Sequence, residues 1–122
     1  MDATKRAGVF RLADVAGLIP GPRGERAALA LKRGTLDITL SIPIAPNQQT
    51  PHEQGELYVV VRGQGRLIHG DQSSAFAAGD VLFVAAGTEH HHADFSADLA
   101  LWRIFYGMPG GEHPLRETGS GA

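Results

Sequence analysis

Residues 50–65, TPHEQGELYVVVRGQG, place candidate metal ligands directly before a predicted strand, and the rest of the chain is arranged around them. His52 and Glu56 are four positions apart, and residues at even separations in an extended chain project from the same face. An imidazole and a carboxylate would then point together into whatever that face encloses. A second histidine group, EHHH at residues 89–92, follows an apolar run further along the chain. The two segments together predict one metal site built from histidine and glutamate.

Strand patterns continue on both sides of this stretch. Residues 56–62 form a predicted strand, residues 63–65 a glycine-assisted turn and residues 66–70 the return strand of a hairpin. Alternating or apolar runs predict five more strands, at residues 27–31, 36–42, 74–77, 81–85 and 99–106. Turns recur roughly every eight to twelve residues with almost no helical periodicity, which is typical of a β-sandwich or barrel.

The chain reads as one domain with an arm at each end. Its 122 residues are enough to bury a core without disulfides. We expect an N-terminal arm over residues 1–25, a β-barrel domain over residues 26–107 and a flexible tail over residues 108–122. Within the first arm, residues 13–19 can form a short helical turn, which the sequence Pro-Gly-Pro at residues 20–22 ends.

Composition excludes several classes of function. Cysteine is absent, so any metal must be held by nitrogen and oxygen ligands. The net charge of −2 arises from interspersed signs, and adjacent basic residues occur only at positions 5–6 and 32–33, so nucleic acid is not an expected partner. No apolar segment has the length of a signal peptide or of a membrane span. We therefore expect a soluble, cytoplasmic protein without a membrane partner.

The segment around His52 resembles the first motif of the cupin superfamily, whose pattern is G-x5-H-x-H-x3,4-E-x6-G. In this sequence three residues separate His52 from Glu56, and six separate Glu56 from Gly63. Thr50 stands where the family has its first histidine. The resemblance therefore implies a site in which one of the family's four metal ligands is replaced.

A later segment resembles the second motif of the same family, G-x5-P-x-G-x2-H-x3-N. Gly79, Gly87 and His90 occupy the matching positions. Ala85 replaces the motif proline, and Asp94 replaces the terminal asparagine. The resemblance implies an all-β fold, namely a double-stranded β-helix or jelly-roll barrel of two antiparallel sheets. It also implies that the histidines and the glutamate of both motifs point into the barrel mouth.

The predicted metal ligands are His52, Glu56 and His90. Two neutral imidazoles and a carboxylate with open positions form the triad that holds divalent iron, and zinc, nickel, manganese or copper also accept such donors. The identity of the metal stays open. Alternation turns His91 to the opposite face, so it is not counted as a ligand. Four further donors could complete the shell, directly or through water: Gln48, Thr50, Gln54 and His92.

The strand after His52 carries apolar residues on both faces. If Glu56 faces inward, Tyr58 and Val60 do so as well, and Tyr58 becomes a pocket residue. The outer face then consists of Leu57, Val59 and Val61. A strand that is apolar on both faces needs a cover on each side. The N-terminal arm and a second copy of the chain are the two candidates, and a homodimer is the favoured expectation, as the cupin resemblance also implies.

Two functions from different classes fit these residues. The first is a metal-dependent enzyme acting on a small polar molecule, dioxygenase-like or isomerase-like by the cupin resemblance, in which the ion polarises an oxygen atom or activates dioxygen. The second is a non-catalytic module that binds a small ligand or a metal. An enzyme needs an acid or base besides the ligands, and the candidates are Glu53, Glu89, Tyr58, His92 and Asp94. The spacing singles out none of them, and fold alone does not decide function.

Overall fold

Alternating apolar and polar residues form strands over most of the chain in the computed structural model, which describes residues 6–47 and 51–113. One short helix precedes the strands. The elements are α1 (Leu12–Ala16), β1 (Ala27–Arg33), β2 (Leu36–Ser41), β3 (Gly55–Arg62), β4 (Gln64–His69), β5 (Gln72–Ala77), β6 (Val81–Val84), β7 (His91–Ala93) and β8 (Ala100–Tyr106). The strands predicted from the sequence are present to within two residues at each end, which is the usual uncertainty of element boundaries.

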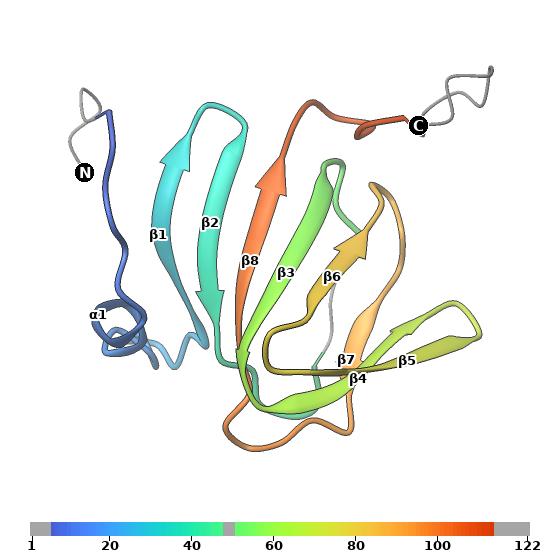
Figure 1. The fold of residues 1–122 in the computed structure, drawn as a ribbon, viewed down its shortest axis with the longest axis horizontal. Coiled ribbons are helices and arrows are strands. Elements are labelled where there is room, and N and C mark those ends of the chain that lie inside the picture. Colours follow the sequence, from blue (N-terminus) through green and yellow to red (C-terminus); the bar gives the residue numbers. More distant parts are fainter. Residues whose placement is uncertain (1–5, 48–50, 114–122) are drawn as a thin grey trace.

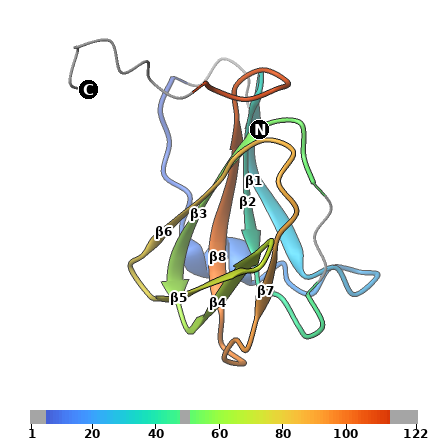
Figure 2. The same ribbon diagram turned by 90° about the vertical axis from the view of Figure 1, so that its right-hand side faces the viewer.

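The strands form two antiparallel sheets, which confirms the predicted all-β jelly-roll class. The larger sheet has the order β1-β2-β8-β3-β6, and the smaller has the order β5-β4-β7. The last strand of the chain thus lies in the middle of the larger sheet, between β2 and β3. Figures 1 and 2 show the smaller sheet beside the β3 and β6 end of the larger one, whereas β1 lies at the opposite end with α1.

The interior of the barrel holds the first of two hydrophobic clusters. Residues of β3 and β6 face residues of β4 and β5 across the space between the sheets, and residues at the start of β8 close the cluster. Its buried members are Tyr58, Val60, Leu67, Phe76, Leu82, Val84, Leu99 and Leu101. The smaller sheet thus packs on only part of the larger one.

The second hydrophobic cluster lies on the outer face of the larger sheet, under α1. Val15 is the buried residue of the helix, and it packs in one cluster with Leu40 of β2 and Ala100 of β8. Val61 and Trp102 pack against the same cluster from β3 and β8. The N-terminal arm, one of the two covers that the sequence analysis considered, therefore lies over one end of the apolar outer face. Within the residues that the structure describes, no helix is long and apolar enough to cross a membrane.

Candidate functional site

Strand β3 turns two polar side chains into the barrel. Glu56 and Tyr58 alternate with Leu57, and each is only 1% exposed. The backbone of Glu56 pairs with Phe105 of β8, and that of Tyr58 pairs with Arg103 of the same strand. The two inward positions thus share one face of the sheet with the inward positions of β8.

His90 enters the same space from the segment before β7 and is 4% exposed. Its Nδ1 lies 3.1 Å from the carbonyl oxygen of Thr88. Because a carbonyl oxygen only accepts hydrogen bonds, Nδ1 carries the hydrogen in this contact. In the neutral ring, Nε2 is then an unprotonated acceptor, directed at the side chains from β3. The neighbouring residue His91 is exposed, as the alternation predicts.

Glu56, Tyr58 and His90 form one buried cluster. The Tyr58 hydroxyl donates a hydrogen bond to Glu56 Oε2 at 2.7 Å, and Tyr58 Oη also lies 3.1 Å from His90 Nε2. His90 Nε2 and Glu56 Oε1 are 3.4 Å apart. The phenol has a single hydrogen, and its shorter contact is with the carboxylate. With a neutral imidazole, two lone-pair atoms therefore face one another, an arrangement that a proton or a metal cation between them would stabilise.

Tyr58 is a neutral hydrogen-bond donor in this cluster. Burial raises the pKa of its hydroxyl far above the ordinary value, and the charge of Glu56 and the hydrogen bond to that carboxylate raise it further. The positive charge of Arg103 acts in the opposite direction on the same pKa. Tyr58 therefore keeps its proton and orients Glu56, rather than acting as a general base.

His92 is buried beside the cluster without a polar partner. It is 2% exposed, and neither ring nitrogen makes a hydrogen bond to a described residue. Its ring meets the edges of Tyr58 and Phe76, with centroid separations of 4.8 and 5.8 Å. Burial, followed by the charges of His90 and His91, lowers the pKa of His92 from 6.5 to about 4. The side chain is a neutral imidazole with two unused polar atoms.

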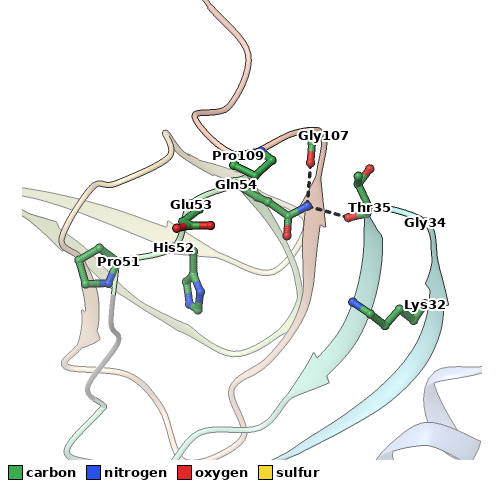
Figure 3. A pocket seen from close by; sticks show the side chains of 9 residues that line it. All are labelled: Lys32, Gly34, Thr35, Pro51, His52, Glu53, Gln54, Gly107 and Pro109. Carbon is green, nitrogen blue, oxygen red and sulfur yellow. Dashed lines mark hydrogen bonds between the residues drawn. The ribbon is translucent and has the colours of Figure 1, made fainter.

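His52 lies at the mouth of the barrel rather than in the cluster. Its ring packs on Phe105 at 4.4 Å between centroids. It also lines a cavity of about 510 Å³ between the start of β3, the β1–β2 turn and the segment after β8. Figure 3 shows His52 and Lys32 reaching into this space from opposite sides. Gln54 lines the same cavity, where its amide nitrogen donates to the carbonyls of Thr35 and Gly107, both at 2.8 Å.

The predicted ligands are thus brought together only in part. Glu56 and His90 meet, whereas His52 contacts an aromatic ring. Across residues 6–47 and 51–113, no three histidine, cysteine, aspartate or glutamate side chains are grouped so that they could hold a metal ion. Gln48 and Thr50, two of the further donors considered from the sequence, lie outside the described residues.

Arg103 is the interior residue that sequence reasoning missed. Its backbone pairs with Tyr58 on one side and with Thr39 on the other. Its guanidinium carbon lies 4.9 Å from the centre of the Phe105 ring, and its Nε is buried without a hydrogen bond to a described residue. The signal was present in the sequence LWRIFY of β8, where one cation interrupts an otherwise apolar strand at a position whose parity faces inward.

Comparisons with known proteins relate the sequence and the fold of this chain to one family. A family model described as the cupin domain matches residues 42–101, which include His52, Glu56 and His90. The chain carries a cupin domain. Uncharacterized protein SCO3923 of Streptomyces coelicolor is 34% identical over 76 residues, which are 62% of this chain and 63% of that protein. The match therefore spans less than two thirds of that relative.

Solved structures of cupin proteins share this fold. A cupin-2 domain containing protein from Shewanella frigidimarina superposes with a TM-score of 0.58 at 16% identity, over 83% of this chain and 94% of that one. The DMSP lyase DddQ from Ruegeria pomeroyi superposes with a TM-score of 0.57 at 16% identity, over 66% of this chain and 46% of that one. At these identities the likeness establishes the cupin fold and no activity.

The polar side chains of this cupin divide into an exposed and a buried set. Glu53, Glu89 and Asp94, considered above as acids or bases, are all exposed. Tyr58 and His92 from the same list are buried at the cluster. The protein groups that can act on a ligand inside the barrel are therefore concentrated on β3, β7 and β8.

Proposed function

We propose that this cupin binds a divalent metal ion at Glu56 and His90, with His52 as the third ligand, and uses it to act on a small molecule in the barrel. The observation that carries the proposal is the pair of lone-pair atoms, Glu56 Oε1 and His90 Nε2, which face each other at 3.4 Å in a buried site. A carboxylate and a neutral imidazole are the donors that such an ion takes from a chain without cysteine.

The contacts around the pair support ligation by these two residues. The carbonyl of Thr88 fixes the His90 tautomer that leaves Nε2 free to bind an ion, and the Tyr58 hydroxyl holds one oxygen of Glu56. Metal ligands typically have such outer partners, which orient them. His52 packs on Phe105, and the backbone of Phe105 pairs with Glu56. Ligation by His52 requires its ring to leave this contact.

The bound ion would act as a Lewis acid that polarises a carbonyl or enolate oxygen, or it would activate dioxygen. The chain's own residues have separate tasks. Tyr58 stays protonated and keeps Glu56 oriented, and the apolar residues around Phe76 and Leu82 exclude water from the cluster. His92 remains neutral beside it and offers a donor and an acceptor to a ligand. An isomerase-like or dioxygenase-like activity is the class that this arrangement suits.

The test is metal binding by protein purified without a histidine tag and stripped with a chelator. We expect the wild type to bind about one Zn²⁺ or Mn²⁺ per chain in a calorimetric titration. Glu56→Gln and His90→Ala should each weaken binding by more than the roughly 10- to 100-fold loss that follows removal of an outer-shell partner. Tyr58→Phe, which removes only such a partner, should fall within that range. His91→Ala is the matched control, because His91 is the exposed neighbour of His90.

Two results would contradict this assignment. One is binding in His90→Ala that equals binding in His91→Ala. The other is tight binding in the wild type that does not change in Glu56→Gln. The His52→Ala variant addresses the third ligand separately. It should bind more weakly than the wild type, and an unchanged affinity would show that His52 stays on Phe105.

A metal-free binding module is the second candidate, and one observation favours it. The Tyr58 hydroxyl contacts both Glu56 and His90, and no group of three ligands is assembled among the described residues. A protonated His90 would then neutralise Glu56, and the barrel would bind a polar ligand without turnover. Under this alternative, the stripped protein binds its ligand as well as the metal-loaded protein does.

A further inference from the structure

We propose that Arg103 binds the carboxylate group of the ligand, so that the substrate of this cupin is a small organic monocarboxylate. This inference rests on the proposed function in one respect, namely that the Glu56–His90 cluster is the reactive end of the site. It adds the chemical class of the ligand and the residue that recognises it.

Arg103 lies on the inner face of the larger sheet, one strand away from the cluster. Its Cα partner on β3 is Tyr58, which is 1% exposed and belongs to the interior core. Cross-strand partners share a face of the sheet, so the guanidinium and the Tyr58 ring point to the same side. The positive charge of Arg103 also lowers the pKa of the Tyr58 hydroxyl against the stronger effects of burial and Glu56. A ligand held by Arg103 therefore lies next to the cluster.

The guanidinium has no carboxylate partner in the described part of the chain. Two ion pairs there join Lys32 to Asp37 at 3.8 Å and His90 to Glu56 at 3.4 Å, and neither includes Arg103. The Nε of Arg103 is buried and makes no hydrogen bond to a described residue. A buried donor on a charged group is costly unless it is paired. The guanidinium carbon of Arg103 lies over the Phe105 ring, and such a cation–π contact does not use the N–H groups, which can still donate to an anion.

The ligand class follows from the shape of the donor and from the surrounding charges. A guanidinium presents parallel N–H groups that match the two oxygens of a carboxylate. Glu56 lies in the next inward row on β3, and Asp37 lies in that row on β2. Those two carboxylates already contact His90 and Lys32, so the charge of Arg103 is left for an anionic group of the ligand. One unpaired cation therefore suits one carboxylate group.

Arg103 and His52, which lies at the mouth of the barrel, both contact Phe105. The centre of the Phe105 ring lies 4.9 Å from the guanidinium carbon of Arg103 and 4.4 Å from the centre of the His52 ring. His52 also lines the cavity of about 510 Å³. Arg103 itself is partly exposed.

The experiment compares charged and uncharged ligands of equal shape. Lactate and propionate, lactamide and propionamide, succinate and inorganic phosphate are titrated into ¹⁵N-labelled protein, and the arginine Nε–H signals are followed. We expect the Arg103 signal to shift with lactate or propionate and not with the two amides. Arg103→Gln should weaken binding of the monocarboxylates about 10- to 100-fold, which is the loss expected for hydrogen bonds to a charged group, and Arg103→Lys should recover part of it.

Arg66→Gln is the matched control, since it also removes one cation, but Arg66 hydrogen-bonds to Ser73 in the neighbouring strand of the smaller sheet. Metal content is measured in every variant. The inference is supported if Arg103→Gln keeps its normal metal content but no longer binds the carboxylates. A wild type that binds carboxylates but no metal would refute the proposed metal site and leave the inference about Arg103 intact. Equal binding of acids and amides, binding unchanged in Arg103→Gln, or tighter binding of phosphate than of monocarboxylates would each overturn the inference. The comparison of acids with amides in the wild type still tests the inference if a variant does not fold.

Discussion

Position 63, which joins β3 to β4, requires glycine because of its backbone conformation and because its neighbours leave no space for a side chain. Its φ is 87°, and an added Cβ would lie 2.7 Å from the Cα of Leu99 and from the Oγ of Ser96. Gly63→Ala should therefore destabilise the fold by about 2–3 kcal/mol, the sum of left-handed strain and overpacking. Urea unfolding measures this loss.

Gly70 is the control for that substitution, because it has a φ of 60° and open space around the position of a Cβ. Gly70→Ala should cost only the backbone strain, about 1–2 kcal/mol. Equal losses in the two variants would show that the contact with Leu99 does not matter. Asp94, which replaces the asparagine of the second motif, has a φ of 50°, and both residue types tolerate this conformation. The replacement is thus compatible with the backbone.

His92 should make the metal-free protein less stable in acid. Its pKa is lowered from 6.5 to about 4 in the folded state. Between these pH values His92 is therefore protonated in the unfolded chain and neutral in the folded chain. The contribution is complete above pH 6.5, falls as the pH drops towards about 4, and amounts to about 3 kcal/mol. The groups that face the ring are Tyr58, Phe76 and His90, with His91 contributing charge.

The measurement is the free energy of unfolding against pH, in the presence of a chelator, for the wild type and His92→Leu. The wild type should lose more stability than the variant between pH 6.5 and 4. His113→Gln, at an exposed position, should behave like the wild type. Parallel curves for the wild type and His92→Leu would contradict a neutral, buried His92.

Much of the site could be predicted at the residue scale from alternation alone. The parity of β3 placed Glu56 and Tyr58 inside, and the parity of β7 placed His92 inside. Alternation gives the face of a residue but not its contacts. It could not show that His52 packs on Phe105, or that the Tyr58 hydroxyl bonds to Glu56, because both depend on where separate segments meet.

At the scale of elements, α1 stabilises the larger sheet from outside. Val15 is 7% exposed and packs with Leu40 and Ala100 on the outer face. Val15→Ala should cost about 1–2 kcal/mol, from two lost methyl groups and the space they leave. Val9→Ala is the matched control, because Val9 is 77% exposed, and it should leave the midpoint of urea unfolding almost unchanged. No difference between the two would mean that α1 is not docked in solution.

The sequence predicted where the strands lie along the chain better than it predicted which strands are neighbours in a sheet. Hydrophobic periodicity, which is a local signal, located every strand except β7, whose short segment His91–Ala93 carries two histidines and no apolar alternation. The position of β8 between β2 and β3 was not predicted, because strand pairing between distant segments depends on contacts across the whole chain. The pairing of β8 with β3 places Arg103 opposite Tyr58. Because this pairing was not predicted, Arg103 was not among the predicted site residues.

At the scale of the whole molecule, the outer face of the larger sheet remains apolar beyond the reach of α1. Val81 is 62% exposed and Phe83 is 61% exposed on β6, beside Leu57 and Val59 of β3. We expect a second copy of the chain to cover this face, because contiguous exposed apolar residues on a sheet are typical of an interface. The protein should then be a homodimer, with a mass twice that of the 12.9 kDa chain, by size exclusion with light scattering.

The double variant Val81→Lys/Phe83→Glu should dissociate this dimer into monomers with an unchanged fold. Ile44→Lys serves as the control, since Ile44 is exposed to the same extent (62%) but lies in the loop after β2. A monomeric wild type at micromolar concentration would contradict the expected homodimer. A dimer that persists in the double variant would place the interface elsewhere.

The central claim is that the buried pair of Glu56 and His90 holds a metal ion, and anomalous diffraction at the metal absorption edge tests it most directly. Crystals of tag-free protein loaded with Zn²⁺ should show one anomalous peak per chain. The ion should lie about 2.0–2.2 Å from Glu56 Oε1 and from His90 Nε2, two atoms that are 3.4 Å apart without it. The absence of a peak between these two atoms in fully loaded protein, or a peak bound only by exposed side chains such as His91, would contradict the claim.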